Sequence, residues 1–434
     1  MKKHIPKMAA ALVPRELTNW SLTSITLGAL EGGLLGVIVK NQFADVASPA
    51  AVNLAVAIVA GAPSFTNLAS FLYSSWSSGR DKLRIMSRLM QVMGIATLLM
   101  ALPPANATGL FLFCLLTVVA RTAWSGILTL RASVWRANYP RDWRAQITAK
   151  LVRLSSLLVA AVAALVGFLL DWQDDFYRPC FVLAGICSLF AARIYGKARI
   201  RRHQQLLAKE RAAKVEGRRH ISLAVFGEVL RGDRDFRNYM WCMMVFGGAN
   251  LMVIPMLVVM LNEQFHLSQW HQVMVTSSLP LVIMCFAVPR WARLLDRKHI
   301  FAYRALHSWY YVLSYVFFAL ALGTGTAWLL WPAAMLLGGA NAGGHLGWNL
   351  GHNDFTNDAN AAQYMAVHVS LTGLRGIFMP LLGIGFYQFL SHFLPVMAPH
   401  ALLFPLFLSA AGAAWFVILN AEHSKRIIQN QGLD

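Results

Sequence analysis

The chain repeatedly returns to apolar stretches about 20 residues long, the length that an α-helix needs to cross the hydrocarbon core of a bilayer. Of its 434 residues, 57% are hydrophobic and only 13% are charged, whereas soluble domains carry about 25% charged residues. The sequence therefore predicts an all-α integral membrane protein with twelve transmembrane helices. We expect them at residues 17–39, 50–73, 85–103, 108–130, 147–170, 177–196, 238–261, 270–290, 301–323, 327–350, 362–389 and 400–420.

The lysines and arginines predict how these helices are oriented, because cytoplasmic loops are enriched in both residues. With the N-terminus inside, all but four of the 38 lysines and arginines fall on the cytoplasmic side. These include Arg304, which we expect at the cytoplasmic end of a helix. Of the four, Lys40 and Arg178 fall outside, and Arg121 and Arg375 fall within spans. We therefore expect both termini in the cytoplasm and the protein in the inner (plasma) membrane of a bacterial-type cell.

The longest connection, residues 197–237, is strongly basic and divides the chain into two parts of similar length. We expect a six-helix bundle at 1–196, a basic cytoplasmic linker, and a second six-helix bundle with a short tail at 238–434. LGALEGG (27–33) matches FGGANLM about half the chain later, and other matches with nearly the same offset indicate two parallel repeats. We expect the basic linker to contact anionic lipid headgroups and not nucleic acid. We also expect the protein to be a monomer.

The sequence lacks the patterns of enzymes and metal proteins. It contains no GxSxG, no Walker sequence and no HExxH. Its five cysteines show no CxxC or Cys/His spacing, and the basic N-terminal tail does not resemble a cleaved signal peptide. We therefore expect no enzymatic activity, no cofactor and no bound metal, with an ion gradient as the energy source.

Three short segments carry a family resemblance. They are Gly79, Arg80 and Lys82 after the second predicted helix, Asp296, Arg297 and Lys298 at the corresponding place in the second half, and RASVWRANYPRDWRAQ (131–146) after the fourth. Together with twelve helices in two parallel halves, they resemble the major facilitator superfamily of secondary transporters. The first loop lacks the family's upstream Asp-Arg and the second its glycines, so the resemblance names no subfamily and no substrate. It implies alternating access, in which the two halves rock about a central cavity lined mainly by helices 1, 4, 7 and 10.

Charged residues inside predicted spans are the strongest candidates for function, because such residues are rare and usually face the interior. Glu31, Arg121 and Arg375 lie in predicted helices 1, 4 and 11. The two arginines are suited to hold an anionic or zwitterionic group through charge-assisted hydrogen bonds. The Glu31 carboxylate is suited to gain and lose a proton as the cavity opens and closes. The alternative is that Glu31 and Arg121 neutralise each other and brace the first half.

Uncharged polar residues extend this candidate site. The stretch from Gly338 to Gly376 is the densest polar segment of the chain. We expect substrate contacts from Ser24, Asn250, Asn341 and His345, in addition to Arg121 and Arg375, and we expect His345 to take part in proton coupling together with Glu31. A histidine that only bonds to a neighbouring helix is the competing interpretation.

The loop between predicted helices 10 and 11 is acidic, whereas the other short inner loops are basic. We expect Asp354 and Asp358 to form a cytoplasmic gate with Arg141, Arg144 and Arg297 that closes in the outward-open state. The segment DFTND lacks the glycine and glutamate of a calcium loop. A transition-metal gate through His345, His352 and Asp354 remains a weaker alternative.

The sequence thus predicts a proton-coupled secondary transporter of a small or medium organic solute that carries an anionic or zwitterionic group. Two alternatives stay open. One is an exporter of amphipathic drugs or siderophore-like chelates, which the fourteen tryptophans and abundant methionines permit. The other is a transporter-like receptor that moves nothing, since a fold alone does not fix function.

Overall fold

The computed structural model describes residues 7–139, 141–215, 223–356 and 360–430, and these segments consist of helices and the turns between them. The first half contains α1 (Lys7–Ala29), α2 (Gly32–Gln42), α3 (Pro49–Phe65), η1 (Thr66–Ala69), α4 (Ser70–Ser77), α5 (Lys82–Leu99), α6 (Ala107–Asn138), α7 (Arg141–Trp172), η2 (Asp174–Phe176) and α8 (Tyr177–Gly196). The connection to the second half holds α9 (His203–Val215) and α10 (Leu223–Gly232).

The second half begins with the long helix α11. Its helices are α11 (Arg234–Phe265), α12 (Gln269–Val273), η3 (Met274–Ser278), α13 (Leu279–Leu295), α14 (Ile300–Thr324), η4 (Ala327–Leu329), α15 (Leu330–Leu350), η5 (Gly351–Phe355), α16 (Ala361–Phe393), η6 (Pro395–His400) and α17 (Leu403–Asn430). Side-chain caps set several of the starts. Asp81, Asn106 and Asp233 accept hydrogen bonds from backbone N–H groups in the first turns of α5, α6 and α11.

Ten helical stretches within the described residues are long and apolar enough to cross a membrane. They coincide with ten of the twelve predicted spans, and the multi-pass helical prediction is confirmed to that extent. The remaining two, 85–103 and 327–350, are the helices α5 and α15, which are less apolar. Basic residues fill the first turns of α5, and asparagine and histidine side chains interrupt α15. Twelve crossings therefore remain a prediction.

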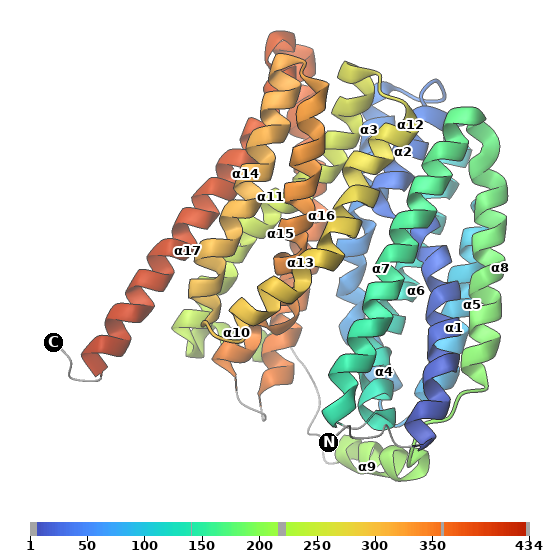
Figure 1. The fold of residues 1–434 in the computed structure, drawn as a ribbon, viewed down its shortest axis with the longest axis vertical. Coiled ribbons are helices and arrows are strands. Elements are labelled where there is room, and N and C mark those ends of the chain that lie inside the picture. Colours follow the sequence, from blue (N-terminus) through green and yellow to red (C-terminus); the bar gives the residue numbers. More distant parts are fainter. Residues whose placement is uncertain (1–6, 140, 216–222, 357–359, 431–434) are drawn as a thin grey trace.

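The long helices run alongside one another in two groups (Figure 1). Helices α1, α5, α6, α7 and α8 lie on one side, and α11, α14, α15 and α17 lie on the other. The groups touch where α2 and α3 pack on α11, α3 packs on α16, and α7 packs on α12 and α13. The first turn of α1, the last turn of α17 and α9 lie at one end of the bundle, which we call the terminal end. The opposite end carries residues 43–48 and 266–268.

The first span is broken, which differs from the continuous helix predicted at 17–39. Helix α1 ends at Ala29, Leu30 and Glu31 are not helical, and α2 starts at Gly32. Glycine weakens a helix interior, and Gly32 and Gly33 follow the break directly. A free backbone segment inside a membrane is stable only when buried protein groups satisfy it. The break is therefore a feature that neighbouring side chains must support.

The two halves are joined at the opposite end by a buried polar cluster. Lys40 of α2 donates to Glu263 of α11 at 2.5 Å and to Asn53 of α3 at 2.7 Å. The hydroxyl of Tyr387 of α16 donates to the other oxygen of Glu263 at 2.6 Å. The sequence predicts Lys40 on the outside, but the structure leaves only 7% of it exposed. Glu263 compensates its charge, and Asn53 accepts a second hydrogen bond. Asn262 also donates to Asn41 at 2.9 Å, so this end is closed by contacts between the halves.

Replacing Lys40 by methionine should lower the thermal unfolding midpoint in detergent, because the Glu263 carboxylate loses its cation and stays partly buried. Adding Glu263→Met removes the stranded charge, so the double variant should recover part of the loss. The expected coupling between the two sites is roughly 0.5–3 kcal/mol. Lys298→Met, at an exposed position, is the matched control and should change nothing. Strictly additive effects of the two single substitutions would contradict a stabilising pair.

Candidate functional site

A cavity of about 410 Å³ lies between the two halves. It is lined from the first half by α3, η1 and α6, and from the second half by α11, α14, α15 and α16. Its polar and charged lining includes Arg121, Ser125, Asn250, Arg304, Tyr311, His345, Thr372 and Arg375. The described lining residues include three arginines and no aspartate or glutamate. The cavity wall is therefore positively charged.

Arg121 supports the break in the first span. Its Nη2 donates to the carbonyl of Leu30, at the C-terminal end of α1, and Glu31 is an electrostatic neighbour. The C-terminal end of a helix is partially negative and presents free carbonyl groups, so a cation is favourable there. Sequence analysis placed Arg121 and Glu31 together at the cavity, and the structure does bring them together. The helix break, which sequence analysis missed, supplies the reason.

Glu31 caps the second part of the broken span. Its Oε2 accepts from the backbone N–H of Gly33 at 2.8 Å and of Leu34 at 3.2 Å, at the N-terminal and partially positive end of α2. In a continuous helix, Ser24, Gly28 and Glu31 would share one face, but the chain leaves the helical path before Glu31. Glu31 is also not part of the cavity lining, although its partner Arg121 is.

The Glu31 carboxylate also reaches the second half of the molecule. The hydroxyl of Ser277 donates to the same oxygen, Oε2. Ser277 lies in η3, a π-helical turn, and such turns often occur at functional sites. A Cβ on Gly33 would lie 2.2 Å from Ser277 Oγ and 2.8 Å from Thr276 Oγ1, so only glycine allows this approach. Two irregular segments, one from each half, therefore meet at Glu31.

Arg375 lies flat against α11. A Cβ on Gly247 would lie 2.7 Å from Arg375 Nη1 and 2.8 Å from Cζ, so the absence of a side chain makes room for the guanidinium. Its Nη1 donates to the carbonyl of Met243, and its Nη2 donates to Thr372 Oγ1 at 3.0 Å. The arginine is only 5% exposed. The prediction that Arg375 reaches the central cavity agrees with its place in the lining.

Arg304 is the lining residue that sequence analysis assigned wrongly. It was counted as a cytoplasmic helix end, but the structure leaves only 1% of it exposed, in the second turn of α14. Helix α15 makes room for its guanidinium, because residue 347 is a glycine. A Cβ on Gly347 would lie 2.8 Å from its Cζ. A signal was present in the sequence, since Arg304, Tyr311 and Tyr315 share one helix face at steps of seven and four.

The other predicted substrate contacts divide into two groups. Asn250 and His345 line the cavity, and His345 is exposed into it with Arg131 of α6 as an electrostatic neighbour. Asn341 lies outside the lining and accepts a hydrogen bond from Tyr311 at 2.9 Å. Ser24 also lies outside it, because its hydroxyl bonds to Ser155 of α7 at 2.7 Å and is fully buried. These last two contacts hold helices together.

Only two of the predicted gate residues, Asp354 and Arg297, have side chains that the structure describes, so the gate stays a prediction. Asp354 accepts from the backbone N–H of Ile300 at 2.6 Å, within the second half, and Arg297 is exposed. Asp358 lies outside the described residues, and Arg141 and Arg144 are described only as backbone of α7. The gate was predicted for the state closed at the cytoplasmic side. Among the described residues, no three His, Cys, Asp or Glu side chains are grouped to hold a metal, which leaves the transition-metal alternative without support.

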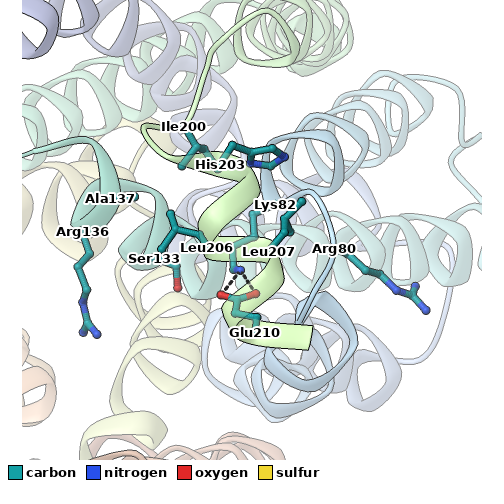
Figure 2. Close-up of a pocket in the computed structure, with 10 residues that line it drawn as sticks. All are labelled: Arg80, Lys82, Ser133, Arg136, Ala137, Ile200, His203, Leu206, Leu207 and Glu210. Atoms are coloured by element: carbon teal, nitrogen blue, oxygen red, sulfur yellow. Dashed lines mark hydrogen bonds and ion pairs between the residues drawn. The ribbon is translucent and has the colours of Figure 1, made fainter. Parts of the chain in front are cut away.

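A second pocket, of about 530 Å³, lies between α9 and the adjoining ends of α5 and α6 (Figure 2). Its Lys82 donates to both carboxylate oxygens of Glu210, each at 2.6 Å, and the N–H of Gly79 donates to Glu210 at 3.0 Å. The side chains of Arg80 and Arg136 point away from α9. The ion pair between Lys82 and Glu210 attaches α9 to the first half and neutralises the lysine. Because the pocket also does not lie between the two halves, it is the weaker candidate for transport.

Known proteins are similar to this chain over most of its length. Residues 19–380 match the family model described as Major Facilitator Superfamily. A search of curated proteins gives no match. Among solved structures, a D-xylose–proton symporter superposes with a TM-score of 0.70 at 13% identity, covering 94% of this chain and 97% of that one.

Two further solved structures are similar over nearly their full lengths. A POT family transporter in complex with a thioalcohol-conjugated peptide gives a TM-score of 0.68 at 12% identity, with 97% and 98% of the two chains covered. A bacterial homologue of the human lysosomal transporter Spinster, in an inward-facing and occupied conformation, gives 0.66 at 11% identity, with 96% and 98% covered. Likeness at these identities shows a common fold.

The capping role of Glu31 predicts different effects for two substitutions. Glu31→Ala removes the acceptor for two backbone N–H groups and for Ser277, so it should cost about 1 kcal/mol of stability and lower the unfolding midpoint. Glu31→Gln keeps an acceptor oxygen and should lower the midpoint less. Thermal unfolding in detergent measures both. An alanine variant as stable as the glutamine variant would show that the cap contributes nothing.

Proposed function

Because the chain belongs to the major facilitator superfamily, and is therefore a multi-pass membrane transporter and not an enzyme, we propose that it moves a small or medium organic solute with an anionic or zwitterionic group. Transport follows alternating access, with the two halves rocking about the central cavity. The xylose, peptide and Spinster-type names of the similar structures do not agree on a cargo, so the cargo class is proposed from the cavity itself.

The observation that carries this proposal is the charge of the cavity lining. Arg121, Arg304 and Arg375 lie in its wall, and the lining contains no acidic residue among those described. Cationic side chains in a low-dielectric space favour an anion strongly, because water screens their charge little there. Asn250, Tyr311 and His345 add neutral polar groups that are suited to contact the rest of an organic solute.

We assign proton coupling to Glu31, on the grounds of its contacts across the two halves. In this conformation its carboxylate holds Ser277 of η3, caps α2 and attracts Arg121. Protonation would remove the negative charge from all three contacts at once. It would therefore weaken the link between the halves and leave Arg121, which already lines the cavity, without its acidic partner. His345, exposed into the same cavity, is the proposed second group on the proton path.

The proposal includes the arrangement of the chain in the membrane. It comprises twelve spans in two parallel halves, 1–196 and 238–434, joined by the linker 197–237, in the inner membrane with both termini cytoplasmic. The terminal end of the bundle would then face the cytoplasm, and the cluster around Lys40 and Glu263 would close the outer side. Anionic lipid headgroups would contact the basic linker. The transporter would act as a monomer, with a later state closed by Asp354 and Arg297.

Uptake into proteoliposomes tests the function. Purified protein should accumulate radiolabelled organic anions when a pH gradient is imposed, and should not do so when an ionophore collapses that gradient. Glu31→Gln should abolish gradient-driven accumulation, because it removes the acidic group and keeps the hydrogen-bond acceptor. Exchange of labelled for unlabelled solute without a gradient should persist in this variant.

Glu422→Gln, at an exposed position of α17, is the matched control and should behave like the unmodified protein. Full accumulation by Glu31→Gln would refute the assignment of coupling to Glu31. Uptake of neutral amphipathic solutes, with no preference for anions, would favour the exporter alternative over the proposed cargo.

A further inference from the structure

Three polar side chains of the second half form a cluster at the cavity wall, two of them in the lining. They are Arg304 of α14 and His368 and Arg375 of α16, and each is an electrostatic neighbour of the other two. All are buried, with 1%, 2% and 5% of their surfaces exposed. Buried polar atoms nearly always have hydrogen-bond partners. In this cluster Arg304 Nε and Nη2, Arg375 Nε and both ring nitrogens of His368 have none.

The charges of this cluster are also uncompensated. Besides His368 and Arg375, the electrostatic neighbours of Arg304 include Tyr239 and His307, and Tyr239 is also a neighbour of Arg375. Neither arginine has a carboxylate partner within the part of the chain that the structure describes. Arg121 differs, because it has Glu31 and the end of α1. Two adjacent buried cations without an acid are unfavourable, and an anion between them would remove that cost.

The way the guanidinium of Arg304 lies indicates what kind of anion fits. The Cβ position of Gly347 is nearly equidistant from Arg304 Cζ, Nη2 and Nε, at 2.8, 2.8 and 3.0 Å, so the flat face of the group rests on α15. The unpaired nitrogens Nε and Nη2 form one edge of that plane. This edge has the spacing that pairs with two oxygens of a carboxylate or phosphate, whereas a halide offers a single point.

We propose that Arg304, with Arg375 and His368, forms the subsite for an oxyanion group of the cargo, a carboxylate or a phosphate. This inference rests on the proposed function and deepens it. The anionic group binds in the second half, against α14 and α16, and is not shared symmetrically between Arg121 and Arg375. Arg121 remains the partner of Glu31 and links the cavity to the proton. The rest of the cargo occupies the central cavity beside Asn250 and His345.

The substitution Arg304→Met distinguishes an arginine that binds an anion from one that only supports the fold. Methionine fills similar space without charge, so the ligand-free variant should unfold at the same or a higher temperature than the unmodified protein, because an uncompensated buried cation is removed. A supporting arginine would give the opposite result. The measurement is thermal unfolding in detergent, in sodium chloride and then in increasing sodium phosphate or sodium acetate at equal ionic strength.

The unmodified protein should gain stability from phosphate or from acetate beyond the effect of chloride, and the better anion identifies the group. In Arg304→Met the concentration for half of this gain should rise roughly ten-fold or more, as expected for a lost charged hydrogen-bond pair. Gly347→Ala, which displaces the guanidinium, should weaken the gain in the same direction. Gly339→Ala, whose added Cβ meets nothing within 4 Å, and Arg290→Met, at an exposed position, are the matched controls.

Two results would overturn the subsite. One is an Arg304→Met protein that is less stable in chloride or does not fold, since the cation would then be compensated. The other is an unchanged oxyanion response in both Arg304→Met and Gly347→Ala. Either result, together with uptake of organic anions by proteoliposomes, would leave the proposed function standing. Absence of anion uptake, together with the expected loss of response, would establish the subsite and refute the cargo proposal.

Discussion

The structure depends on how charged side chains are held away from water. A buried cation is stable only where negative or polar groups compensate it. The break between α1 and α2 provides such groups for Arg121, through the carbonyl end of α1 and through Glu31. The same break leaves the start of α2 to be capped by Glu31. Helix geometry and charge therefore support each other in the first half, and a change in the charge of Glu31 would act on both.

The buried arginines of the second half have no acidic partner among the described residues, unlike Arg121. Gly247 and Gly347 let Arg375 and Arg304 lie against neighbouring helices, yet the pair has no acid in the described residues. Under the proposed function, this asymmetry would separate proton coupling near Glu31 from binding of the anionic cargo in the second half. The hydrogen bond between Glu31 and Ser277 lies where the two halves meet, so it is a direct route by which one event would influence the other.

Apolar segment length and composition were enough to predict the helical membrane fold, because crossing a bilayer restricts both. The ten spans that meet the length and composition criteria lie where the sequence placed them. Arg121 and Arg375 were identified as cavity residues by the rarity of charge within spans, and both line the cavity. Asn250 and His345 also line it, whereas Ser24 and Asn341 do not. Residue spacing shows which side chains share a helix face, but not which neighbouring helix or cavity that face contacts.

The errors have physical causes. Arg304 and Lys40 lie near predicted span ends, where an exposed position is the usual one, and only tertiary partners reveal that they are buried. The break at Leu30 depends on support from Arg121, which is distant in sequence. The predicted gate around Asp354 concerns another conformation, so its formation stays a prediction.

A structure determined with selenate would show directly whether the buried arginines of the second half bind an oxyanion. Selenate resembles an oxyanion cargo group, and its selenium can be located by anomalous scattering. We expect an anomalous peak within hydrogen-bonding distance of Arg304 and Arg375, at the wall of the central cavity. A cavity without such a peak, with selenate found only on the basic surface around α9, would contradict it.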